Sequence, residues 1–91
     1  MASEFHLSVL TPERTVFEGA VEYLQVPGSQ GSMGVLAHHA PLVTALSSGE
    51  LTLRRAGGGE ERMLVSGGFF EVSSNRATVL ADHVSEGLPA R

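Results

Sequence analysis

Several residue types that common catalytic and metal sites depend on are absent or scarce in this sequence. There is no cysteine, which excludes disulfides, thiolate nucleophiles and cysteine-based zinc sites. There is no lysine either, since all six basic residues are arginine. Walker-type phosphate loops, Schiff-base enzymes and Ser–Lys dyads are therefore excluded. Asp82 is the only aspartate, so neither an EF-hand loop nor a two-aspartate dyad can be built.

Positive charge and long apolar runs are also scarce. The formal net charge of −4 argues against a nucleic-acid partner, because phosphate recognition needs a basic surface. No apolar run exceeds three residues, so neither a membrane span nor a signal peptide is expected. We expect a water-soluble chain of a reducing or redox-neutral compartment. The 91 residues, 42% of them hydrophobic and 18% charged, are enough for one globular domain with one modest core.

Short alternating segments between glycines and prolines predict an all-β fold. Phe5, Leu7 and Val9 alternate with polar residues, as do Leu51 and Leu53, which is the period of a half-buried strand. Roughly eight to ten such strands, spaced by about 8–12 residues, predict a β-sandwich or a small barrel. We expect a flexible N-terminus over residues 1–4, the domain over residues 5–84 and a frayed tail over residues 85–91.

Particular residues predict how these strands turn and bend. Glu22 interrupts the alternation of Leu24 and Val26, which predicts a bulge or an edge position. Gly57–Gly59 predicts a tight hairpin, and Ser74-Asn75 predicts a second turn. Val65-Ser66-Gly67-Gly68 lacks the glycine of a nucleophile elbow, so we interpret it as a bend between two strands.

The strand that follows this bend supplies a test of the core. We expect Phe69 to be buried between the sheets. The substitution Phe69→Ala would then destabilise the domain by about 3–5 kcal/mol.

The glycine-rich stretch Gly28–Gly34 is interpreted as a series of turns forming a long surface loop. Its glycines do not have the spacing of a dinucleotide-binding fingerprint. Loops on a rigid scaffold commonly carry recognition. The side chains of this one are uncharged, which suits a polar protein partner better than an anion; they are Ser29, Gln30, Ser32 and Met33.

Histidines are the only candidate metal ligands besides carboxylates. His38 and His39 are adjacent, and His6 and His83 lie far away in the sequence. A three-histidine site on a cupin-like barrel is one alternative, although closely spaced ligand pairs such as H-x-H are missing. A free-standing β-sandwich that binds a peptide or a sugar is a second alternative. No residue pattern in the chain calls for catalysis.

Six segments resemble the N-terminal domain of the epsilon subunit of F-type ATP synthases, called delta in mitochondria. They follow the family's order and spacing over residues 5–84. The segments are Leu10–Gly19, Val26–Gly28, Gly34–Leu36 with His39–Leu42, Ser48–Leu53, Val65–Phe69 with Glu71-Val72, and Thr78–Asp82.

This resemblance implies a flattened sandwich of two five-stranded sheets and a non-catalytic place in the rotor. The domain would hold the foot of the gamma subunit and rest on the polar loops of the membrane c-ring. It would need no cofactor and lie peripherally on the cytoplasmic face of the inner (plasma) membrane. A permanent interface of this kind predicts an exposed apolar patch.

The resemblance also implies contact residues. The stretch Gly28, Ser29, Gln30, Gly31, Ser32, Met33 and Gly34 matches the region that faces the c-ring. The family often carries an acidic residue where this chain has Ser32, and Pro-Gly where it has Ala37-His38. Surfaces near gamma and the ring match Thr11, His38, His39, Pro41, Leu42 and Thr44.

Most bacterial relatives continue into a helical C-terminal domain, and this chain stops at Arg91 without a D-x-x-R-A segment. We therefore expect neither self-inhibition by C-terminal helices nor ATP binding by this chain.

Overall fold

The computed structural model describes residues 3–86, and every regular element in that range is a β-strand. The strands are β1 (Phe5–Leu10), β2 (Thr15–Gly28), β3 (Gly31–Val35), β4 (Leu42–Ala45), β5 (Gly49–Arg55), β6 (Glu60–Ser73) and β7 (Arg76–Ser85). The all-β prediction is confirmed. Within residues 3–86 no helix has the length and apolarity needed to span a membrane. Residues 1–2 and 87–91, parts of the two ends predicted to be loose, lie outside the described range.

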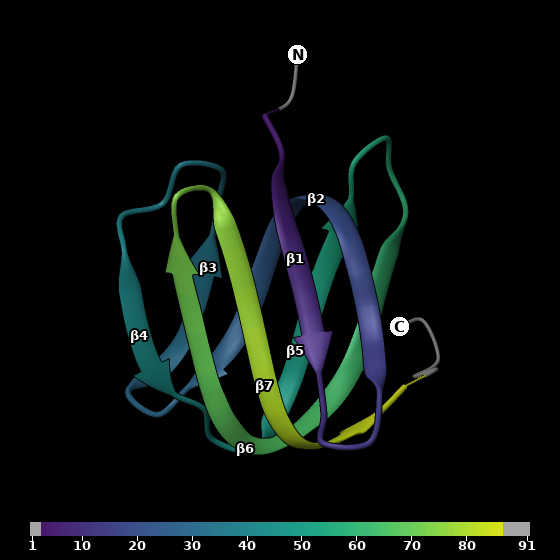
Figure 1. Cartoon of the computed structure of the whole chain (residues 1–91), viewed down its shortest axis with the longest axis vertical. Coiled ribbons are helices and arrows are strands. Elements are labelled where there is room, and N and C mark those ends of the chain that lie inside the picture. The colour runs from purple at the N-terminus through teal and green to yellow at the C-terminus, as the bar shows by residue number, and fades with distance from the viewer. Residues whose placement is uncertain (1–2, 87–91) are drawn as a thin grey trace.

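Two layers arise because the long strands β2 and β6 each contribute to both (Figure 1). One layer consists of β3, the second half of β2, β5, the first half of β6 and the end of β7. The other consists of β4, the second half of β6, β7, β1 and the first half of β2. Seven strands therefore supply the five strand segments of each layer. The segments before and after Val65-Ser66-Gly67-Gly68, which were expected to form two strands, are both parts of β6.

The core lies between the two layers and contains only apolar side chains. On β1 the buried positions are Phe5, Leu7 and Val9, as the alternation predicts. No polar or charged side chain of residues 3–86 is buried. The other buried hydrophobics are Val21, Leu24, Val26, Val35, Leu46, Leu51, Leu53, Met63, Val65, Phe70, Val72, Ala77, Val79, Ala81 and Val84.

A bulge in β2 lies where the sequence predicts an irregularity. Val21 and Leu24 are both buried although three positions separate them, and the pairing with β5 shifts register between Val21 and Tyr23. The extra residue turns the Glu22 side chain out of the core. The two turns expected at Gly57–Gly59 and Ser74-Asn75 are also present. All five of these residues have positive φ, which suits tight hairpin connections.

The glycine pair Gly67-Gly68 bends β6 from one layer into the other. Their φ angles are 64° and 114°, and a Cβ on Gly68 would overlap the Leu80 carbonyl oxygen of β7. The inward-facing positions shift by one residue here, from Met63 and Val65 to Phe70 and Val72. The predicted bend therefore exists, but it lies within one strand.

The expected burial of Phe69 is wrong. Its side chain is 59% exposed, whereas Phe70 is fully buried. The reason is the shift at Gly67-Gly68, which places Phe70 on the inward face and Phe69 on the outward one.

Candidate interaction surfaces

The stretch Gly28–Gly34 forms a hairpin and not the series of turns expected from its glycines. Residues 31–35 are strand β3, which pairs with the end of β2, and only Ser29-Gln30 make the turn. Ser32 Oγ accepts a 2.6 Å hydrogen bond from Gln25 Nε2 on β2. Met33 packs against the core. The hairpin is therefore an ordered part of the sheet.

The tip of this hairpin is tied to the connection between β4 and β5. The Ser29 amide donates to the Ala45 carbonyl oxygen at 3.0 Å, and the Ser47 amide donates to the Pro27 carbonyl oxygen at 2.8 Å. Gly28 and Leu46 form a bridge between the same segments. The exposed side chains of Ser29 and Gln30 are thus presented from a backbone that is held on two sides.

The segment that joins β3 to β4 carries His38 and His39. His38 has a φ of 64°, and its amide donates a 2.7 Å hydrogen bond to Asn75 Oδ1 in the β6–β7 turn. Asn75 Nδ2 in turn donates to the Glu4 carbonyl oxygen at 3.0 Å. His39 Nδ1 lies 2.8 Å from the Ala40 carbonyl oxygen. A single side chain, Asn75, therefore links this segment to the start of the chain.

Strand β4 turns Leu42 and Thr44 partly towards the core, so that both side chains are half-buried. These two pair with the buried residues Val72 and Phe70, and Leu42 packs against the core. Val43, which the sequence reasoning did not single out, is 67% exposed. Alternation along β4 could have pointed to it.

The predicted gamma and ring contacts do not form one site. Thr11 lies in the β1–β2 turn, where its amide donates to the Arg14 carbonyl oxygen at 2.9 Å. That turn lies at the end of the molecule opposite the β3–β4 segment with His38, His39 and Pro41 (Figure 1). The predicted contact residues are therefore distributed along the length of the molecule.

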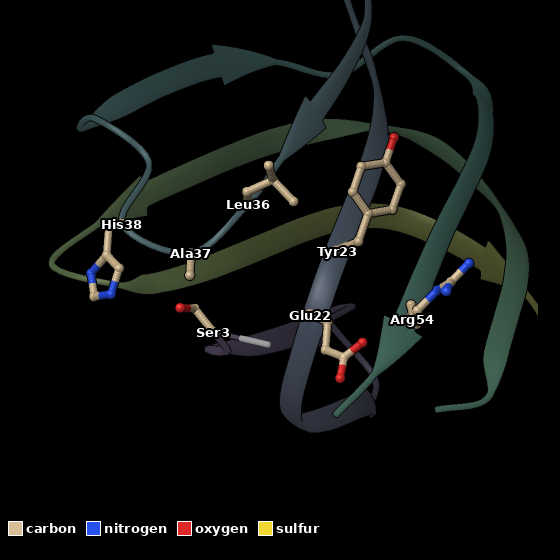
Figure 2. A pocket seen from close by; sticks show the side chains of 7 residues that line it. All are labelled: Ser3, Glu22, Tyr23, Leu36, Ala37, His38 and Arg54. Atoms are coloured by element: carbon tan, nitrogen blue, oxygen red, sulfur yellow. The ribbon is translucent and has the colours of Figure 1, made fainter. Parts of the chain in front are cut away.

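A hollow of about 520 Å³ opens beside His38 (Figure 2). Leu36, Ala37 and His38 line one side, and Ser3, Glu22, Tyr23 and Arg54 complete it. Glu22 Oε2 accepts a 3.3 Å hydrogen bond from the Gly57 amide. The lining mixes apolar groups with charges of both signs, so it presents no single ligand chemistry.

The histidines are spread over the fold. His6 on β1 lies 3.2 Å from Glu18 of β2, and His83 is exposed near the end of β7. Among residues 3–86, no three histidine or carboxylate side chains gather in a way that could hold a metal ion. The arrangement that a cupin-like site requires is thus not formed by the described residues.

An apolar row crosses the outer face of the layer that contains β4, β6, β7 and β1. Ala45 pairs with Phe69, Phe69 with Leu80, and Leu80 with Leu10, so four neighbouring strands each contribute one apolar side chain. Phe69 is 59% exposed and Leu80 is 52% exposed. We call these four residues the apolar row.

Comparison with known proteins places this fold in a family. Residues 4–87 match the model of the beta-sandwich domain of the ATP synthase delta/epsilon chain. The chain belongs to this ATP synthase delta/epsilon family. Its resemblance to the epsilon subunit is thereby confirmed over nearly its whole length.

Individual members of the family agree with this assignment. The ATP synthase epsilon chain of Syntrophomonas wolfei is 41% identical over 85 residues, which is 93% of this chain and 62% of that one. The chain therefore spans less than two thirds of the length of this relative.

Two solved structures share the fold. A chain in the Euglena gracilis mitochondrial ATP synthase superposes with a TM-score of 0.86 at 24% identity, covering 91% of this chain and 53% of that one. A chain in the Tetrahymena thermophila mitochondrial ATP synthase gives a TM-score of 0.76 at 15% identity, covering 92% and 67%. At these identities the likeness establishes the fold alone.

Proposed function

We propose that this chain is a non-catalytic rotor subunit in the central stalk of a proton-translocating F-type ATP synthase. It binds the gamma subunit and the c-ring, and it couples ring rotation to ATP synthesis and hydrolysis. It lies peripherally on the cytoplasmic face of the membrane as part of that complex. The observation that carries the proposal is the family match over residues 4–87, with 41% identity to an epsilon chain.

The fold suits the transmission of torque. A coupling part has to resist deformation, and the interior of a closely packed sandwich is about as dense as an organic crystal. Here one continuous hydrogen-bonded sheet runs through both layers, because β2 and β6 belong to each. Load applied at one layer is therefore passed to the other through covalent backbone as well as through side-chain packing.

The β2–β3 hairpin is the proposed contact with the c-ring. Within the stretch Gly28–Gly34, the exposed Ser29 and Gln30 form the tip of the hairpin. Backbone hydrogen bonds join this tip to the β4–β5 connection. Uncharged polar side chains on a braced tip can form hydrogen bonds with polar ring loops without ordering a mobile loop first. The Ser32 hydroxyl already accepts a hydrogen bond from Gln25, so Ser32 stabilises the hairpin.

The proposed gamma and ring contacts extend along the molecule. They comprise Thr11, His38, His39, Pro41, Leu42 and Thr44. Because Thr11 and the histidines lie at opposite ends, gamma would follow the long axis of the domain (Figure 1). Such a lengthwise contact provides the leverage that rotation without slip requires.

Co-purification tests this proposal directly. The full chain should bind the gamma subunit encoded by the same organism and remain with it through size-exclusion chromatography at physiological salt. Gln30→Ala is the matched control, since Gln30 is assigned to the ring and its loss should leave gamma binding unchanged. Separate elution of the unaltered chain and gamma would contradict the proposal.

A further inference from the structure

We propose that the turn of the β2–β3 hairpin and the β4–β5 connection together recognise a partner surface that is itself uncharged. We call these two loops, residues 28–31 and 46–48, the uncharged tip. The tip binds through hydrogen bonds without ion pairs. This inference rests on the proposed function, and it assigns uncharged polar side chains to the c-ring loops where they meet the tip.

The charged residues of the chain are unevenly distributed. Every aspartate, glutamate and arginine lies in residues 1–22 or 50–91, and residues 23–49 contain none. At 18% charged residues, a stretch of that length would carry about five. His38 and His39 lie between the end of β3 and the start of β4, whereas the tip lies at the start of β3 and the end of β4. The tip is therefore without formal charge in a chain whose net charge is −4.

The fold makes one surface of the two loops. β3 and β4 lie on the same side of the sandwich, and each has the tip at one of its ends (Figure 1). Gly28 and Leu46 form a bridge between the loops, and the Ser47 hydroxyl donates to the Pro27 carbonyl oxygen at 3.2 Å. Loops that belong to different strands thus present their side chains together.

Polar side chains in the body of the hairpin are bound to one another. The Tyr23 hydroxyl donates to Gln25 Oε1 at 3.1 Å, and Gln25 Nε2 donates to Ser32 Oγ at 2.6 Å. Hydroxyl and amide groups both donate and accept, so those that remain at the tip can bind polar groups of a partner. Within residues 3–86, three exposed tip side chains form no hydrogen bond: Ser29, Gln30 and Ser48.

The absence of charge also determines which partners the tip rejects. A charged side chain that docks there loses hydration, and the tip offers no opposite charge in return. Glu50, the acidic residue closest to the tip in the sequence, is bound to Arg62 at 2.6 Å. An anionic lipid surface is disfavoured as well, because binding it requires lysine or arginine. Rejection of this kind contributes to specificity as much as attraction does.

The test compares two affinities for the purified c-ring of the same organism, that of gamma bound to the full chain and that of gamma alone. The ratio of the two isolates the contribution of this chain. It should change by less than about twofold between about 0.05 and 0.5 M salt, because salt screens ion pairs far more than uncharged hydrogen bonds. A ratio that falls steeply with salt would contradict the inference.

Substitutions of both signs test whether the ring surface is uncharged. Gln30→Glu and Gln30→Lys should each weaken ring binding at least about fivefold, because either charge would lose hydration without a counter-charge. Ser48→Glu should act in the same direction. Tighter binding by one of the Gln30 variants would mean that the ring carries the opposite charge there, and the inference would be wrong.

Ser85→Glu is the matched control, since it adds the same charge at an exposed position at the end of β7. That end lies on the other side of the sandwich from β3 and β4 (Figure 1), so ring binding should equal that of the unaltered chain. The melting temperature of each variant verifies that it folds.

The outcomes separate this inference from the proposed function. If the chain strengthens ring binding by gamma but both Gln30 variants bind as tightly as the unaltered chain, this inference is wrong and the proposed function stands. If gamma with the chain binds the ring no more tightly than gamma alone, both are wrong.

Discussion

Phe69 and Phe70 are neighbours in sequence with opposite environments. Phe70 is fully buried between the layers, and Phe69 is 59% exposed on the outer face. Phe70→Ala should therefore lower the free energy of unfolding by about 3–5 kcal/mol, whereas Phe69→Ala should change it by less than about 1 kcal/mol. Urea denaturation of the two variants beside the unaltered chain measures both values. Similar losses for both variants would contradict the orientation of β6.

The sequence could predict that this region forms a strand, but not which face each phenylalanine occupies. Alternation counted from Met63 and Val65 places Phe69 inward, as we expected. The two glycines with positive φ interrupt that count by one position. The interruption depends on how closely β6 approaches β7, which local sequence does not report.

At the scale of elements, Asn75 connects three separate parts of the chain. Its Oδ1 accepts from the His38 amide, its Nδ2 donates to the Glu4 carbonyl oxygen, and its own carbonyl accepts from the His6 amide. Its φ of 61° is one that asparagine tolerates better than most residues. Asn75 therefore positions the β3–β4 segment, which carries His38 and His39.

Two variants separate the roles of this side chain. Asn75→Gly permits the same positive φ but removes both side-chain hydrogen bonds. Because a hydrogen bond of this kind contributes about 0.5–1.5 kcal/mol, the His38 amide should exchange with solvent roughly 2–13-fold faster. Asn75→Asp keeps the acceptor and should keep most of the protection. Hydrogen exchange followed by NMR measures both, and unchanged His38 exchange in the glycine variant would show that Asn75 does not hold this segment.

The hairpin of β2 and β3 shows a second limit of sequence reasoning. Gly31 and Gly34 led us to expect turns where the structure has a strand. The strand forms because contacts with the neighbouring strand β2 favour it. Gln25 donates a hydrogen bond to Ser32, and the Tyr23 ring lies so close to Gly34 that a Cβ there would be 3.2 Å from the Tyr23 hydroxyl. By contrast, β1 and β5 were predicted correctly from periodicity alone. The bulge at Glu22 is one of the two alternatives that periodicity offered there, the other being an edge position.

For the whole molecule, the sequence predicted the fold class, and the family match confirms the resemblance that six ordered segments suggested. The contact surfaces were harder to predict from the sequence. The apolar row joins residues that are up to 70 positions apart, and only pairing between strands brings Leu10 beside Leu80 and Phe69 beside Ala45.

Reconstitution of the complete ATP synthase tests the central claim, that this domain is a rigid coupling part of the rotor. The enzyme is assembled in proteoliposomes with and without the chain, and the rate of ATP synthesis driven by an imposed proton gradient is measured. The account predicts that synthesis falls to background without the chain and returns when it is added back. Equal rates with and without it would contradict the account.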